Sequence, residues 1–159
     1  MVRRRACCGI ITVMTRWQVR ILANWINGST PLGLVVARVG GCTVRSWERG
    51  LYVASGYDFR FPTGAAFTVG SVIITRHSAA WLEQRPRLFA HEERHAGQFA
   101  ACGGLPLIPL YLLSMAYSQW RTGDRAAANL FELRAGLADG GYAVRPVVRT
   151  LFGRRLAHP

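Results

Sequence analysis

The chain has 159 residues, and about half of them are apolar, which suffices for one compact core and is too little for two. The 20 basic residues against 8 acidic ones give a net charge of +12, a balance common in proteins that bind nucleic acids or anionic membranes. Every basic residue is arginine and most are scattered, so neither a continuous basic stripe nor a nucleic-acid-binding motif is present. We therefore do not expect nucleic acid as a partner.

Two features of the sequence bear on the location of the protein in the cell. The 4 cysteines include no CxxC pair, a pattern that excludes a disulfide framework or zinc ribbon and favours a reducing, cytoplasmic compartment. Three arginines and a short apolar run open the chain without a cleavage site after them. We expect residues 1–13 to be unstructured, or to precede a true start at Met14.

The first half of the remaining chain alternates between apolar runs and glycine turns. Apolar residues at helical spacing predict a helix over 17–26, which Asn27 and Gly28 end. Short runs of β-type residues follow, at 32–39, 42–47, 51–55 and 66–75. They predict a small antiparallel β meander, in which the last run is the most buried strand because Val72, Ile73 and Ile74 are consecutive and β-branched.

The second half is typical of helices. Ser78 can cap a short helix that ends at Glu83, and Pro86 suits the first turn of a helix that runs to about Cys102. The apolar stretch 105–117 is interrupted by prolines and is too short to span a bilayer; we expect a buried core helix there, with an interfacial segment as the alternative. A last helix is predicted over 125–138, with Asp124 as its cap.

These elements predict an α+β protein in which a small antiparallel β meander precedes a helical core. Residues 14–142 form its single domain, and residues 143–159 form a basic tail.

The sequence HEERH at residues 91–95 lies in the predicted helix that starts at Pro86. Histidines four residues apart stand one above the other on a helix, so the imidazoles of His91 and His95 can reach one ion. A neutral histidine pair suits zinc, whose catalytic sites use a third protein ligand and leave one position open. Glu92 is then placed to act as a general base toward water at that position.

The third ligand is expected from a later element, where few suitable residues occur. The downstream candidates are Asp124, Glu132, Asp139 and His158. Glu132 is favoured because it lies among apolar residues, where a carboxylate without a partner is costly. Asn129, one turn earlier, is placed to orient it. Cys102 is better explained as a small buried thiol than as a ligand, and His77 as a surface residue than as a substrate contact.

The order of a strand, an HExxHxxQ helix, the stretch GLPLIPLYLL and the motif NxFExxA resembles the gluzincin-type, zincin-like domains of bacteria. The similarity covers residues 67–142. It implies zinc bound by His91, His95 and Glu132, with Glu92 catalytic. Gln98 matches a glutamine often found after the motif. The electrophile of such enzymes has no single match, since three tyrosines are available: Tyr111, Tyr117 and Tyr142.

Three functions are compatible with these features. The first is a zinc-dependent metallopeptidase-like hydrolase that acts on a peptide or protein substrate, with the edge of strand 66–75 offered to an extended chain. The second is a binding module that zinc stabilises without turnover. The third is a protein associated with a membrane surface through the apolar stretch and the basic tail.

Overall fold

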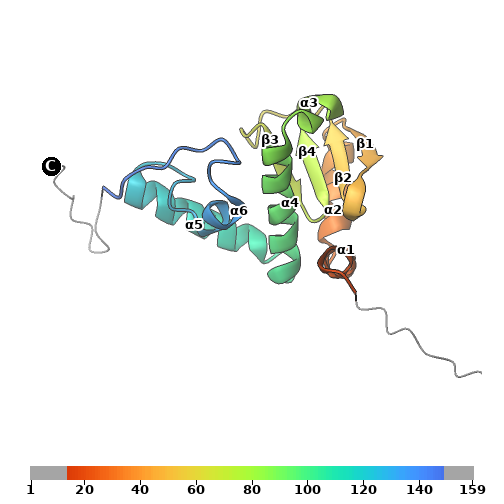
Figure 1. Cartoon of the computed structure of the whole chain (residues 1–159), viewed down its shortest axis with the longest axis horizontal. Helices are drawn as coiled ribbons and strands as arrows, with labels where there is room; N and C mark the ends of the chain where they lie inside the picture. Colours follow the sequence, from red (N-terminus) through yellow and green to blue (C-terminus); the bar gives the residue numbers. More distant parts are fainter. Residues whose placement is uncertain (1–13, 149–159) are drawn as a thin grey trace, which may run out of the picture.

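The computed structural model describes residues 14–148, and Figure 1 shows how its elements are arranged. This part of the chain contains six α-helices, a short 3-10 turn and a 4-stranded sheet, so the expected α+β class is confirmed. Residues 143–148 belong to no helix or strand. Our expectations for residues 1–13 and for most of the tail, together with His158, lie outside the described residues.

The sheet has the strand order β1-β2-β4-β3. Its strands are β1 (Thr43–Ser46), β2 (Tyr52–Ser55), β3 (Ala66–Val69) and β4 (Val72–Thr75). The pairs β1-β2 and β3-β4 are antiparallel, as a meander requires, whereas β2 and β4 are parallel, so the sheet is mixed. The predicted single strand 66–75 is wrong, because a turn at residues 70–71 divides it into β3 and β4. β4 has a strand on each side and is buried along its whole length, as its consecutive β-branched residues predict.

Two helices precede the sheet. α1 (Arg16–Ile26) matches the predicted first helix, but the expected strand at 32–39 is wrong, because α2 (Ser29–Val39) occupies that segment. Pro31 lies in the first turn of α2, where a proline costs no hydrogen bond. The β-branched residues that suggested a strand instead face the sheet or the solvent from a helix, so tertiary packing has overridden their local preference.

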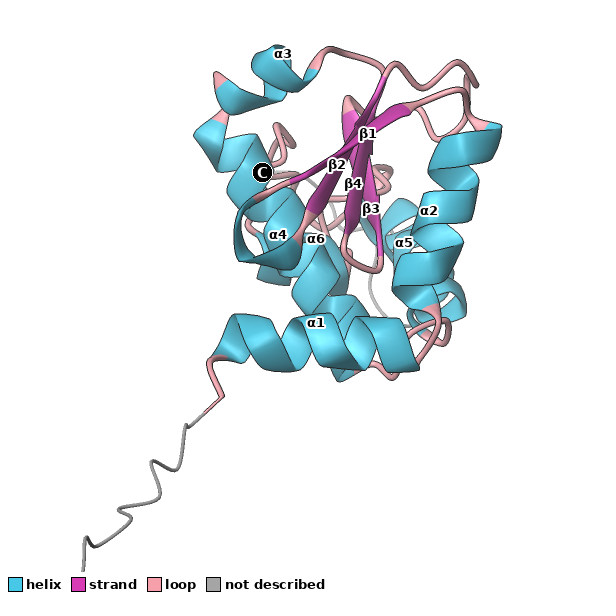
Figure 2. Cartoon of the chain, turned by 90° about the vertical axis from the view of Figure 1, so that its right-hand side faces the viewer, coloured by secondary structure: helices cyan, strands magenta, loops and turns pink. Residues whose placement is uncertain are grey.

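Helices cover both faces of the sheet, as Figure 2 shows: α2 lies on one face, and α3 (Ala79–Glu83) and α4 (Pro86–Ala101) lie on the other. The side chains of β4 alternate accordingly. Val72 and Ile74 pack in a cluster with α2, whereas Ile73 packs in a cluster that includes Leu82 and Ala96 from the other side. The predicted helices 78–83 and 86–102 are thus confirmed to within one residue.

The last two helices extend away from the sheet (Figure 1). α5 (Leu107–Thr122) is not the buried core helix that we expected: its buried residues are Leu107, Ser118 and Thr122, and most of its large apolar side chains are exposed. α6 (Leu130–Ala135) is much shorter than the predicted helix 125–138. Asp124 caps only a turn, where its Oδ1 accepts hydrogen bonds from the two backbone amides of 126 and 127.

α1 is fixed to α4 and to the β3-β4 turn by buried polar contacts. The guanidinium of Arg20 pairs with Glu93 at 2.8 Å. The amide nitrogen of Asn24 donates to the Ala96 carbonyl at 2.9 Å and to the Ser71 hydroxyl at 3.2 Å. These contacts hold α4 from the side opposite to the residues that α6 approaches, so the HEERH helix is supported on both sides.

The close approach of α2 to the sheet yields the first prediction. A Cβ at Gly33 would lie 2.3 Å from the Val69 carbonyl oxygen and 2.9 Å from the Val72 Cβ. Gly33→Ala should therefore push α2 off the sheet and lower the free energy of unfolding by about 1–3 kcal/mol. Gly97→Ala is the matched control, because a Cβ at that helical glycine meets nothing within 4 Å.

Helix propensity alone predicts that both substitutions stabilise the protein by up to about 1 kcal/mol. Thermal unfolding of the two variants separates the effects, since only Gly33→Ala should lose stability. Equal melting temperatures for the two variants would contradict the observed packing of α2.

Candidate metal centre

Three buried side chains from α4 and α6 converge at one point. The Nε2 atoms of His91 and His95 lie 3.0 Å apart, and carboxylate oxygens of Glu132 lie 3.2 Å from the first and 3.7 Å from the second. His91 and Glu132 are each only 2% exposed, and His95 is 9% exposed. One ligand atom from each residue lies within 4.8 Å of the others, so the group can hold a metal ion. The structure thus brings together the three ligands predicted from the sequence.

The protonation of both imidazoles follows from their outer nitrogens. His91 Nδ1 lies 3.0 Å from the Gly136 carbonyl oxygen, which only accepts, so this nitrogen carries a proton. The amide nitrogen of Gln98 donates to the Phe131 carbonyl, which turns Gln98 Oε1 toward His95 Nδ1 at 2.9 Å. His95 Nδ1 must then donate as well. Gln98, whose role the sequence left open, fixes the tautomer and orientation of one ligand.

With Nδ1 of both rings donating outward, the two Nε2 atoms face each other and a carboxylate, so these three groups can share a proton or a metal ion. Oε2 of Glu132 is buried and has no hydrogen-bond donor. Burial opposes the ionisation of Glu132, but the facing imidazoles hold the pKa of this carboxyl well below its ordinary value. Burial also opposes the protonation of His95, but the carboxylate of Glu132 outweighs this effect and raises the pKa of His95. The site therefore favours a positive charge among these three groups, and nitrogen and oxygen donors fit a first-row transition metal ion.

α6 is held so that Glu132 points into the site. Asn129 caps the helix: its Oδ1 accepts from the Phe131 amide at 3.0 Å. Its own backbone amide donates to the Ala126 carbonyl, so Glu132 at the third helical position is not needed to complete a capping box. Asn129 thus orients Glu132 through the helix backbone.

α5 supports Glu132 through polar residues whose contacts the sequence did not predict, since Tyr111 is there only one of three possible electrophiles and Ser114 and Ser118 have no expected role. The Tyr111 hydroxyl donates a short hydrogen bond to Glu132 Oε1. The Ser114 hydroxyl accepts from the amide of Leu130, the first residue of α6, and Ser118 accepts from an amide of the preceding loop. Tyr111, Ser114 and Ser118 are spaced by three and four residues, so their helical periodicity within an apolar stretch could have revealed an inward-facing stripe.

Glu92 is buried and lies against the edge of the sheet. The Thr68 hydroxyl of β3 donates to its Oε2 at 2.7 Å. Burial raises the pKa of Glu92 above its ordinary value, although the positive potential of His95 and the hydrogen bond from Thr68 oppose the shift. A carboxylate with a raised pKa is a stronger base near neutral pH.

The other residues considered from the sequence lie elsewhere. Asp139 pairs with Arg94 at 2.7 Å, and this hydrogen bond lowers its pKa. Cys102 is partly buried and packs against an apolar cluster that includes Phe99. The ring of His77 stacks on that of Trp81, with 3.9 Å between the ring centroids. None of these residues belongs to the group of metal-ligating side chains found in the described part of the chain.

Comparison of the chain with models of protein families, with curated proteins and with solved structures gave no match. The case for a function therefore depends on the geometry of this site. Its strongest element is the convergence of His91, His95 and Glu132, which come from two helices about 40 residues apart in the sequence.

The second prediction concerns the order of effects on metal affinity. Glu132→Gln removes the anionic ligand and should weaken zinc binding in a competition titration by more than roughly tenfold. Gln98→Met removes the acceptor that orients His95 and should weaken zinc binding by at most about 100-fold. Asp139→Asn, the control carboxylate, should change the affinity little, because its partner is Arg94.

A greater loss of affinity in Asp139→Asn than in Glu132→Gln would show that Asp139 is the ligand. Unchanged zinc affinity in both variants would show that neither Glu132 of α6 nor Asp139 is a ligand.

Proposed function

We propose that the protein is a zinc-dependent hydrolase of the metallopeptidase type, which cleaves an amide bond of a peptide or protein. The observation that carries the proposal is the buried group of His91, His95 and Glu132 with their outer hydrogen bonds in place. Zinc binds histidine nitrogen at about 2.0–2.1 Å, which places two such nitrogens about 3.3 Å apart in a tetrahedral site. The observed 3.0 Å between the Nε2 atoms fits zinc with little movement.

When bound, zinc supplies a Lewis acid that makes water a nucleophile near neutral pH and polarises a carbonyl. Glu92 accepts the proton of the attacking water as the water oxygen bonds to the amide carbon. The same carboxyl then donates this proton to the leaving nitrogen as the C–N bond breaks. Thr68 occupies one oxygen of Glu92, which orients the carboxylate and leaves the other oxygen for the proton transfer.

Two further groups support a peptide as substrate. β3 is an edge strand that carries Thr68, so an extended chain pairing with β3 would pass beside Glu92; β4, which ends at Thr75, is paired on both sides and has no free edge. Tyr142 lies beside His91, with ring centroids 6.1 Å apart. Burial and the nearby carboxylate of Glu132 raise the pKa of Tyr142 to about 12, so it keeps its proton and can donate to a developing oxyanion.

The third prediction separates turnover from metal binding. Glu92→Gln should keep the zinc content of wild type, since Glu92 is not a ligand, and should lower kcat for peptide cleavage by at least about a hundredfold. Zinc analysis and cleavage of a quenched fluorescent peptide library measure the two properties. Chelation should lower the melting temperature of both proteins equally, because metal binding is coupled to folding.

A wild-type protein that binds zinc, is stabilised by it and cleaves no peptide would instead indicate the non-catalytic, zinc-stabilised binding module. A protein that binds no zinc when purified in its presence would overturn both functions.

We propose association with an anionic membrane surface as a second candidate function, because α5 exposes an unusually apolar surface. Leu113 is 69% exposed, and other large apolar residues along α5 are exposed by 40% or more: Ile108, Leu110, Leu112 and Tyr117. No charged residue occurs from 96 to 120.

An amphipathic or apolar helix with basic surroundings lies in the interface of anionic lipids, and the net charge of +12 attracts such a surface while it repels a second copy. Among the described residues, no helix combines the length and the apolar character that crossing a membrane requires. α5 would accordingly lie on the membrane.

The fourth prediction is that the protein partitions onto vesicles that contain phosphatidylserine more strongly than onto phosphatidylcholine vesicles. The double change Leu112→Ser and Leu113→Ser should weaken this partitioning by more than roughly tenfold in a flotation assay. The control is Val35→Ser with Val39→Ser, which removes two exposed apolar side chains from α2.

Equal loss in both double variants would place the contact elsewhere. If the protein sediments as a dimer and does not bind vesicles, a second copy of the chain covers α5.

A further inference from the structure

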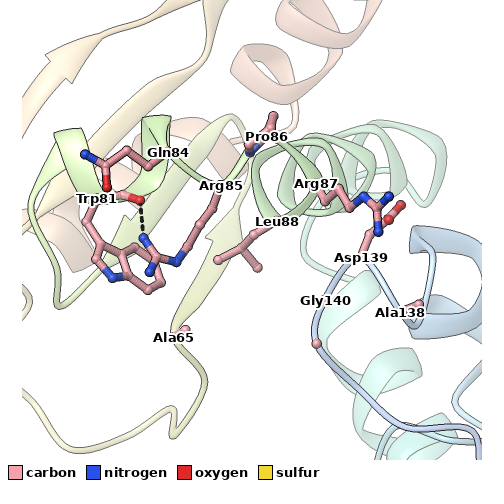
Figure 3. A pocket seen from close by; sticks show the side chains of 11 residues that line it. Ala65, Trp81, Gln84, Arg85, Pro86, Arg87, Leu88, Ala138, Asp139 and Gly140 are labelled. Atoms are coloured by element: carbon pink, nitrogen blue, oxygen red, sulfur yellow. Dashed lines mark hydrogen bonds between the residues drawn. The ribbon is translucent and has the colours of Figure 1, made fainter.

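A pocket of about 550 Å³ opens beside the metal centre, between the start of α4 and the loop after α6. Figure 3 shows its walls: Trp81 and Leu88 on one side, Asp139 and Gly140 on the other. Ala65, directly before the edge strand β3, also lines it. The pocket therefore adjoins both the substrate edge of the sheet and the HEERH helix.

Gly140 is the wall that the pocket shares with the metal centre. A Cβ at this position would lie 2.6 Å from Cε1 and 2.8 Å from Nε2 of His91, the nitrogen that faces Glu132. Only a glycine permits the loop to pass this close to the ligand. A peptide with its reacting carbonyl at the metal centre can therefore place a neighbouring residue in the pocket.

Two arginines give the pocket walls a net positive charge, against one wall carboxylate, Asp139, that Arg94 already pairs with. The guanidinium of Arg85 lies 3.9 Å over the ring of Trp81 and donates to the Trp81 carbonyl at 2.9 Å, which fixes it at the wall. Arg87 lies beside Asp139 (Figure 3), but the Asp139 carboxylate is engaged by Arg94. Among the described residues, neither Arg85 nor Arg87 forms an ion pair within 4 Å.

We propose that this pocket binds a carboxylate of the substrate next to the scissile bond, so that the protein prefers acidic peptides; this inference rests on the proposed function. The carboxylate comes from an aspartate or glutamate side chain or from the peptide C-terminus. Arg85 and Arg87 attract its oxygens from the two ends of the pocket, and the apolar side chain of Leu88 between them contacts the aliphatic part (Figure 3). Charge-assisted hydrogen bonds in a partly enclosed pocket are roughly twice as strong as neutral ones.

The fifth prediction uses the zinc-loaded Glu92→Gln full-length chain, which binds without turnover. Isothermal titration compares peptides that differ only by Glu against Gln, and peptides with a free or an amidated C-terminus. Acidic peptides should bind about tenfold or more tightly than their neutral partners. Arg85→Gln and Arg87→Gln should each reduce this preference, whereas Arg45→Gln on β1 should not, although it removes the same charge.

The outcomes separate this inference from the proposed function. If Arg85→Gln or Arg87→Gln lowers the preference for Glu over Gln peptides, the pocket binds a side-chain carboxylate. If these variants instead lower the preference for a free over an amidated C-terminus, the pocket binds the terminal carboxylate of the peptide. If peptides bind or are cleaved with no acidic preference, or if Arg45→Gln acts like the pocket variants, the inference is overturned and the hydrolase remains. If peptides with and without a carboxylate neither bind nor are cleaved by zinc-loaded protein, both proposals are overturned.

Discussion

The pair of imidazole nitrogens in the core is the contact around which the rest of the structure is arranged. His91 and His95 bury two Nε2 lone pairs 3.0 Å apart, because both Nδ1 protons are committed to Gly136 and Gln98. Two lone pairs at that distance repel each other unless a proton or a metal cation lies between or beside them. Glu132 adds a buried negative charge. Such a group is costly without a cation, so a proton or a metal ion at this point would stabilise the contact between α4 and α6.

α5 illustrates how the site dictates the arrangement of a helix. Between the buried ends Leu107 and Thr122, its inner face carries Tyr111, Ser114 and Ser118, which hold Glu132 and the start of α6. Because these polar residues take the inner face, Leu110, Leu112 and Leu113 are left on the outer face. A helix whose composition is typical of a core thus lies at the surface, and its exposed side is available for another contact.

The local parts of this picture were predictable and the tertiary parts were not. Histidines at i and i+4 on a helix fix their own geometry, and a carboxylate among apolar residues needs a partner, so His91, His95 and Glu132 followed from the sequence. The segment 32–39 misled because its β-branched residues favour a strand locally, while the close fit of Gly33 on the sheet decides for a helix. The parallel pairing of β2 with β4 depends on a long connection that carries no local pattern.

The loop after α6 links ligand geometry to the shape of the pocket. Gly136 has a φ of 89° and its carbonyl accepts from His91, while Arg94 on α4 holds both the Ala135 carbonyl and Asp139. Asp139, which the sequence offered as an alternative ligand, therefore fixes the segment that supplies Gly140 to the wall beside His91. Glu132 and Asp139 have different roles because Glu132 is buried against two imidazoles, whereas Asp139 lies nearer the surface and pairs with Arg94. The loop is also held at two points that do not need the Asp139 carboxylate, since His91 contacts the Gly136 carbonyl and Arg94 donates to the Ala135 carbonyl. Loss of the Asp139 carboxylate alone should therefore leave the hydrogen-bond acceptor of His91 in place.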